Sequence, residues 1–121
     1  AIPAVGFAAL EGANPGTPWV ALVNVAGVGL MLGLLVVWRG NLLAAMGFHT
    51  VWNWLQGMVL GFDVSGLEFH HSVMTTARVT GSRSWLTGGT FGAEGSVIST
   101  IVLAILITGL LVTIRHDWRN N

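Results

Sequence analysis

Residues 40–62, GNLLAAMGFHTVWNWLQGMVLGF, are long and apolar enough to cross a bilayer. Within this stretch His49 and Asn53 stand one helical turn apart, and Gln56 follows close to the same face. Because polar groups left in hydrocarbon are costly, each of them must meet a partner or a polar cavity. The sequence therefore predicts a membrane helix with a polar site near its middle, around which the other segments are placed.

The composition places the chain in the membrane class. Of its 121 residues, 53% are hydrophobic and 8% are charged, the formal net charge is zero, and the mean hydropathy is +0.73. A soluble domain carries roughly a quarter charged residues, so this shortage of charge excludes an ordinary soluble fold. The basic residues include no lysine, which argues against binding to nucleic acid, and the absence of cysteine excludes disulfides and thiolate metal sites.

Three apolar segments have the length of membrane spans, at about residues 19–38, 42–62 and 96–114. Residues 1–10 are typical of the end of a helix that enters from upstream, so we expect the chain to be incomplete at this end. Residues 63–95 are predicted to form a long extramembrane loop. The expected fold is an all-α membrane protein, a single transmembrane domain over the whole chain, with a bundle of about three transmembrane helices and an N-terminal helix fragment.

The arginines predict an orientation in the membrane. If Arg39, after the first span, lies inside, the third span also ends inside, next to Arg115 and Arg119. The long loop and its two arginines then lie outside.

Two spans carry packing signals. Gly29 and Gly33 form a G-x-x-x-G pair that favours close helix packing, either within one bundle or in a homodimer. The third span is almost purely aliphatic and is expected to serve as scaffold.

The H-x-x-x-N pair is the first candidate for chemistry. A neutral His49 can ligate a metal or accept a proton, and Asn53 can stabilise an oxyanion or orient a water molecule. Glu11, at the end of the N-terminal apolar segment, can face His49 if the two segments pack together, which would make His49 and Glu11 ligands of a divalent metal. The alternatives are an interhelical hydrogen bond that holds the bundle together and a carboxylate that caps a helix end.

A pigment site is a rival interpretation of the same segment. Ala45 lies one turn before His49, which leaves room for a planar macrocycle, and Trp52 and Trp54 can contact such a ring. In the alternative, the small residue permits close approach of another helix.

The loop offers weaker signals. The adjacent pair His70 and His71 has a poor geometry for chelation. The glycine-rich TGGTFGAEGS at 87–96 lacks the Gly-Lys-Ser/Thr of a phosphate loop, and its Glu94 and Ser96 suit the N-terminus of the third span.

Several of these segments, in this order, resemble the CPBP family of CAAX-processing and bacteriocin-processing (Abi-type) intramembrane proteases. The similar segments are FAALE at 7–11 followed by NPG, GNLLAAMGFHTVWNWLQGMVLG at 40–61, VSG at 64–66 and TGGTFGAEGS at 87–96. His49 and Asn53 match the family's H-x-x-x-N motif. Phe7 matches its F-x-x-x-H motif, in which Glu11 stands in place of the histidine, and the paired-glutamate motif E-E-x-x-x-R is absent.

The resemblance implies that the chain is the C-terminal part of a CPBP-type intramembrane protease homologue in a bacterial inner membrane. His49, Asn53 and Glu11 would be its catalytic residues, and missing upstream helices would supply the rest. Without the paired glutamates the chain is not expected to cleave peptides alone. The alternative is a catalytically inactive accessory subunit of a larger membrane complex, in contact with pigment. In either case the expected partners are the lipid bilayer and other transmembrane helices.

Overall fold

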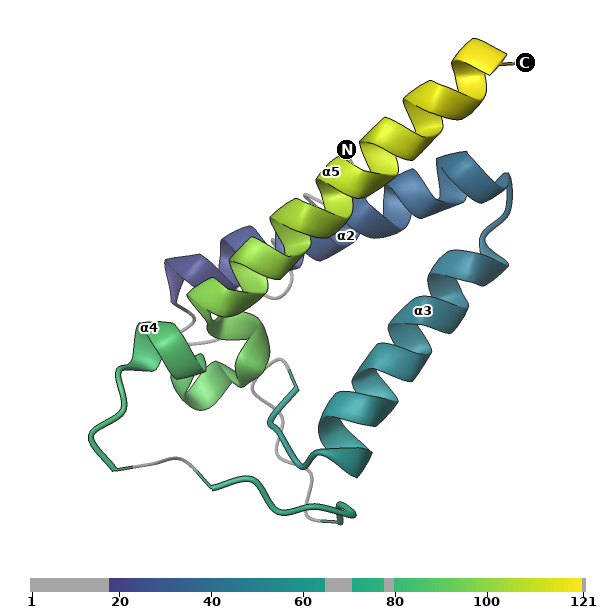
Figure 1. The fold of residues 1–121 in the computed structure, drawn as a ribbon. Coiled ribbons are helices and arrows are strands. Elements are labelled where there is room, and N and C mark those ends of the chain that lie inside the picture. Colours follow the sequence, from purple (N-terminus) through teal and green to yellow (C-terminus); the bar gives the residue numbers. More distant parts are fainter. Residues whose placement is uncertain (1–17, 65–70, 78–79, 121) are drawn as a thin grey trace.

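The structure, a computed structural model, describes residues 18–64, 71–77 and 80–120 (Figure 1). Glu11, His70 and the first of the two loop arginines lie outside these ranges, so the predictions made for them stay predictions. The described part is helical and contains no strand. Its elements are α2 (Trp19–Arg39), α3 (Leu43–Asn53), the π-helix η1 (Trp54–Val59), α4 (Ser84–Thr87), the 3-10 turns η2 (Gly89–Phe91) and η3 (Ala93–Gly95), and α5 (Val97–Asn120).

Local sequence explains where α2 begins and ends. Pro18 precedes it in an extended conformation, which suits a residue at a helix start because proline has no N–H to contribute. At the other end Gly40 adopts the left-handed conformation (φ 68°) and its N–H donates to Val36 O at 2.8 Å. Asn41 Oδ1 then accepts from the Ala44 N–H at 3.3 Å, and α3 starts back in the opposite direction.

The all-α fold is confirmed, and the helix bounds differ from the expected ones at two places. The second apolar segment is divided between the 11-residue α3 and the six-residue π-helix η1. The third helix, α5, continues through the charged residues to Asn120 instead of ending at 114, because arginines suit the last turns of a helix. Among the described residues, α2 and α5 are long and apolar enough to span a membrane, so a third span stays a prediction.

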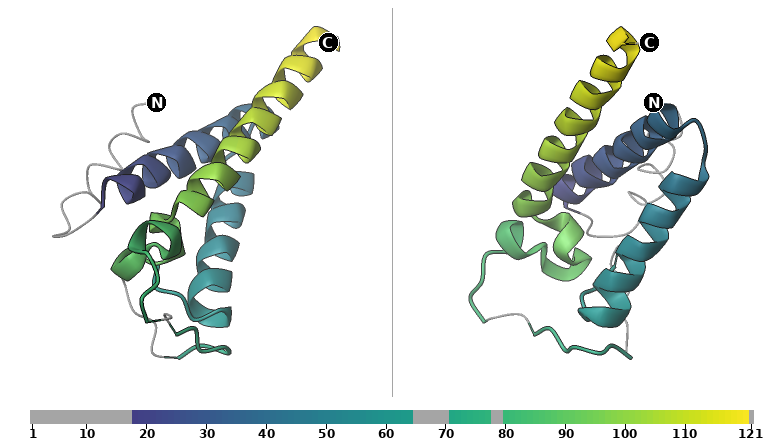
Figure 2. Two further views of the ribbon diagram at one scale, coloured as in Figure 1. Left: turned by 60° about the vertical axis from the view of Figure 1, so that its left-hand side comes forward. Right: turned by 45° about the vertical axis from the view of Figure 1, so that its right-hand side comes forward.

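Helices α2 and α5 run parallel and cross each other (Figures 1 and 2). At their first turns Asn24 Nδ2 donates to the backbone oxygens of Glu94 (2.6 Å) and Ser96 (2.9 Å), and its Oδ1 accepts from Thr100 Oγ1 at 2.7 Å. At their last turns Trp38 Nε1 donates to Asp117 Oδ2 at 2.9 Å. These hydrogen bonds fix the register of the two helices at both ends.

The close approach of α2 and α5 occurs at Gly27, where an added Cβ would lie 3.4 Å from Leu103 Cδ1. Gly33 is exposed, and a Cβ there would meet nothing within 4 Å in the described part of the chain. Gly33 therefore makes no close helix contact within the described bundle, and the homodimer alternative stays a prediction. Within the bundle, Gly27, six residues earlier in the helix, allows the close approach to α5.

Replacing Asn24 by leucine is expected to destabilise the bundle. The change removes the three hydrogen bonds of the buried amide and leaves Glu94 O without its side-chain donor, while Ser96 O still accepts from the Thr100 N–H. The loss should cost about 2 kcal/mol. Unfolding of the purified chain by SDS in mixed micelles, followed by circular dichroism, measures the loss. Thr108→Val is the control, because Thr108 is exposed and bonds only its own helix at Ala104 O (2.7 Å). Equal unfolding midpoints for the two variants would contradict the role given to Asn24.

Candidate functional site

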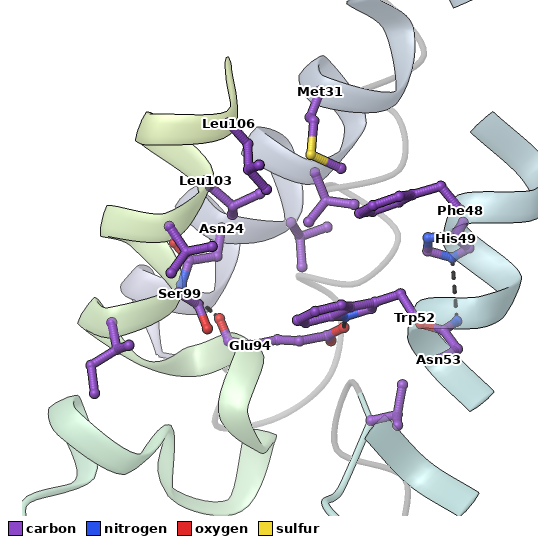
Figure 3. A pocket seen from close by; sticks show the side chains of 15 residues that line it. Asn24, Met31, Phe48, His49, Trp52, Asn53, Glu94, Ser99, Leu103 and Leu106 are labelled. Carbon is purple, nitrogen blue, oxygen red and sulfur yellow. Dashed lines mark hydrogen bonds between the residues drawn. The ribbon is translucent and has the colours of Figure 1, made fainter. Parts of the chain in front are cut away.

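A cavity of about 380 Å³ lies between α2, α3 and α5 (Figure 3). Ten of its described lining residues are apolar or aromatic: Val25, Val28, Met31, Phe48, Trp52, Val64, Ile98, Val102, Leu103 and Leu106. The polar members are Asn24, His49, Asn53, Glu94 and Ser99. The cavity is thus a mostly apolar space with a few polar groups on its wall, which is the usual make-up of a ligand site.

His49 and Asn53 lie on one face of α3 and both line this cavity. Asn53 Nδ2 donates to His49 Nε2 at 3.3 Å, and with the amide in this orientation the imidazole carries its hydrogen on Nδ1. Asn53 Oδ1 is buried and has no hydrogen-bond partner within the described ranges. The predicted pair therefore exists, and its amide presents a buried acceptor in the wall of the cavity.

Asn24 lines the cavity but is committed to structure. It is 2% exposed, and its amide makes three hydrogen bonds to the segment that begins α5. Ser99 is likewise occupied: its Oγ donates to Ala93 O at 2.6 Å, and its N–H donates to Ser96 Oγ at 3.2 Å, which caps α5. These two residues therefore have structural roles, and the candidate reactive side chains of the cavity are on α3 and η3.

Glu94 is a site residue that sequence reasoning missed. It was expected only to suit the N-terminus of the third span, yet it lines the same cavity as His49 and Asn53 (Figure 3). Its Oε1 accepts from Trp52 Nε1 at 3.2 Å. The sequence held one signal for a polar partner near His49, namely Trp52. It lies three residues after His49, on a neighbouring part of the same helix face, and its indole N–H needs an acceptor.

Two glycines shape the loop that carries Glu94. Gly88 (φ 85°) and Gly92 (φ 90°) both have backbone conformations that side chains disfavour, and a Cβ at Gly92 would overlap the backbone oxygen of Asp63. The same Asp63 oxygen accepts from Gln56 Nε2 at 2.9 Å. Asp63 is therefore held between the end of α3–η1 and the glycine loop, so the loop is tied to the helix that bears the histidine.

Gln56 is not part of the cavity wall. Sequence reasoning placed it close to the face of His49 and Asn53, but that estimate assumed an unbroken α-helix. Since a π-helix has more residues per turn than an α-helix, η1 turns Gln56 away toward Asp63.

The described residues give some evidence on the pigment and metal interpretations. Ala45 is only 4% exposed, which favours the interpretation that a small residue permits close packing. Trp52 faces the cavity, whereas Trp54 is 54% exposed and does not line it. No cluster of three or more His, Cys, Asp or Glu side chains suited to a metal occurs in the described segments. The pairing of His49 with Glu11 falls outside them and stays a prediction.

The comparisons with known proteins identify a relationship for the N-terminal part of the chain. Residues 1–55 match the family model for type II CAAX prenyl endopeptidase Rce1-like proteins. The match includes α2, His49 and Asn53, and it stops short of Gln56, Glu94 and α5. No curated protein and no solved structure matches the chain.

Replacing Gly92 by alanine should loosen the loop that carries Glu94. A side chain at this φ, overlapping Asp63, is expected to cost about 3 kcal/mol of stability, measured by the same SDS unfolding. Gly109→Ala in α5 is the matched control, since a Cβ there meets nothing within 4 Å among the described residues. It should leave stability unchanged or raise it by up to about 1 kcal/mol. If the two variants unfold alike, the loop does not depend on Gly92.

Proposed function

We propose, for a chain that belongs to the CPBP family, that His49 and Asn53 form the reactive end of an intramembrane substrate cavity in a protease homologue. One observation carries the proposal: the hydrogen-bonded pair lies in the wall of a largely apolar cavity rather than on a solvent face. We infer that the cavity holds the scissile region of a membrane-embedded peptide. The cavity would then bind the substrate through its apolar wall and act on it through a small number of polar groups.

The chemistry of amide hydrolysis gives each member of the pair a role. Hydrolysis needs a base or a metal to activate water and a donor to stabilise the oxyanion. Asn53 has a second amide hydrogen besides the one given to His49, and this hydrogen can meet the oxyanion. Once the Asn53 amide turns its hydrogen away from His49 Nε2, that nitrogen can serve as a proton acceptor or as one ligand of a divalent metal, with Glu11 as the second ligand.

Other helices must complete this set. The described residues bring one imidazole and one carboxylate, Glu94, to the cavity, and Glu94 already accepts from Trp52. The sequence has no paired-glutamate motif. We therefore propose that this chain acts with transmembrane helices that lie outside it, either an upstream segment or a partner subunit.

A second candidate, a catalytically inactive accessory subunit, is favoured by a different observation. Along α5 only 6% of the most apolar 18-residue stretch is buried, so this helix offers a long apolar surface to lipid or to helices of a larger complex. The hydrogen bond between His49 and Asn53 would then be structural, and Trp52 would be the residue of this cavity that contacts pigment.

The protein is an integral membrane protein, and we place it in a bacterial inner membrane. Because α2 and α5 run parallel, Arg39, Arg115 and Arg119 gather at one end of the bundle. By the positive-inside rule we assign this end to the cytoplasm.

Cleavage by the product of the intact gene, reconstituted in lipid, tests the proposal. With a farnesylated CAAX-type peptide as probe, His49→Ala should abolish cleavage, and Asn53→Ala should lower kcat by roughly 100-fold or more, as for loss of an oxyanion donor. His116→Ala is a matched control, because His116 also pairs with an asparagine four residues on (Asn120 Nδ2, 3.0 Å) but is exposed at the end of α5.

Two outcomes would reject the protease proposal. In the first, the intact protein cleaves the probe and His49→Ala cleaves it equally well. In the second, the intact protein shows no cleavage and purifies as a stoichiometric member of a larger complex, which supports the accessory role.

A further inference from the structure

The last turns of α5 carry a face that the proposed activity does not use. Val112, Arg115, His116, Arg119 and Asn120 recur at the spacing of one helix face, and they line a surface hollow of about 570 Å³. His116 and Asn120 hydrogen-bond to each other at the edge of this hollow. The two guanidinium groups lie beside an apolar residue at the C-terminal end of α5.

The same face continues toward the membrane centre as an apolar stripe. Ile101, Ile105 and Val112 lie along it and are 56%, 65% and 62% exposed. Thr108, between the last two, is also exposed, and its hydroxyl donates to Ala104 O of its own helix. The stripe thus leads from the hydrocarbon region directly to Arg115 and Arg119. A phospholipid has a matching arrangement, with an apolar acyl chain joined to a charged headgroup.

Two tryptophans indicate the depth of the arginines. At 1.5 Å per residue the 24 residues of α5 extend about 36 Å, which exceeds a hydrocarbon core of about 30 Å. Trp118 is 74% exposed at this end, and Trp38, hydrogen-bonded to Asp117, lies at the same level. Tryptophan favours the membrane interface, so Arg115 and Arg119 lie at the height of the headgroups.

The charge of the two arginines is available to a ligand. Asp117, between them in sequence, accepts from Trp38 Nε1 through Oδ2, and its Oδ1 lies 3.6 Å from Nδ1 of His116. Within the ranges that the structure describes, neither Arg115 nor Arg119 forms an ion pair. Arg39 belongs to the other side of this end, since its guanidinium lies 5.2 Å from the centre of the Trp38 ring.

We propose that Arg115 and Arg119 bind the phosphate of an anionic phospholipid whose acyl chain lies along the stripe through Val112. A guanidinium group can donate two parallel hydrogen bonds to phosphate oxygens. Because the two arginines lie at the depth of the headgroups, their side chains can contact the phosphate directly. The net negative charge of phosphatidylglycerol distinguishes it from phosphatidylcholine, which has the same phosphate with a compensating cation. The surface therefore selects lipids by net charge at a defined place on the helix. This binding is independent of the proposed cleavage.

Lipid titration of the detergent-purified chain tests the site. Native mass spectrometry with phosphatidylglycerol or phosphatidylcholine of equal chain length gives the apparent Kd of the first bound lipid. Wild-type protein should prefer phosphatidylglycerol, and Arg115→Gln combined with Arg119→Gln should weaken that binding by roughly 30-fold while leaving phosphatidylcholine binding unchanged. Helix content by circular dichroism checks that the double variant is folded.

Arg39→Gln is the matched control, because it removes a cation from the same end of the bundle but not from this face. It should change the Kd for phosphatidylglycerol by less than about twofold if the site is local. The proposal is overturned if wild-type protein binds both lipids equally, or if Arg39→Gln weakens binding as much as the double variant does. Displacement of the bound lipid by inorganic phosphate would show an anion site rather than a lipid site and would also overturn it.

Discussion

The buried amide of Asn24 is the constraint on which the arrangement of the helices depends. In a bilayer the lipid is as apolar as the side chains, so hydrophobic burial does little to bring two apolar helices together. Asn24 instead joins α2 to the start of α5 and the residues just before it through three hydrogen bonds, across 70 or more positions of sequence. With the tie between Trp38 and Asp117 at the far end, it sets the crossing of α2 and α5 and thereby two walls of the cavity.

The third wall, α3, is placed by weaker means. It follows α2 through the turn at Gly40. Two hydrogen bonds hold its other end, one from Trp52 Nε1 to Glu94 Oε1 and one from Gln56 Nε2 to Asp63 O. Both of these contacts lead to the glycine loop before α5. The position of His49 and Asn53 is thus decided by a loop far away in sequence, and the same loop supplies the Asn24 acceptors. One compact segment therefore coordinates all three helices around the cavity.

Hydropathy and local rules predicted the main helices and the His49–Asn53 pair, because a span length and an i, i+4 spacing are properties of neighbouring residues. The sequence did not reveal Asn24, since a lone asparagine in an apolar span has the same local signature whether it joins helices or not. Nor did it reveal Glu94 in the cavity, which requires the path of the glycine loop. The π-helix at η1 was missed for a similar reason, and it moved Gln56 off the expected face.

The chain contains two H-x-x-x-N pairs, and comparing them shows that the motif alone does not make a functional site. His49 with Asn53 and His116 with Asn120 have the same spacing, and in both pairs the amide bonds the imidazole, at 3.3 Å and 3.0 Å. The second pair is exposed at a helix end, where water competes for every polar group. The first lies in an apolar cavity, where an amide or imidazole interacts more strongly because the surroundings screen it less. The hydrogen bond is therefore a local consequence of helical spacing, and the capacity for chemistry comes from the enclosure that α2, α5 and the glycine loop build around α3.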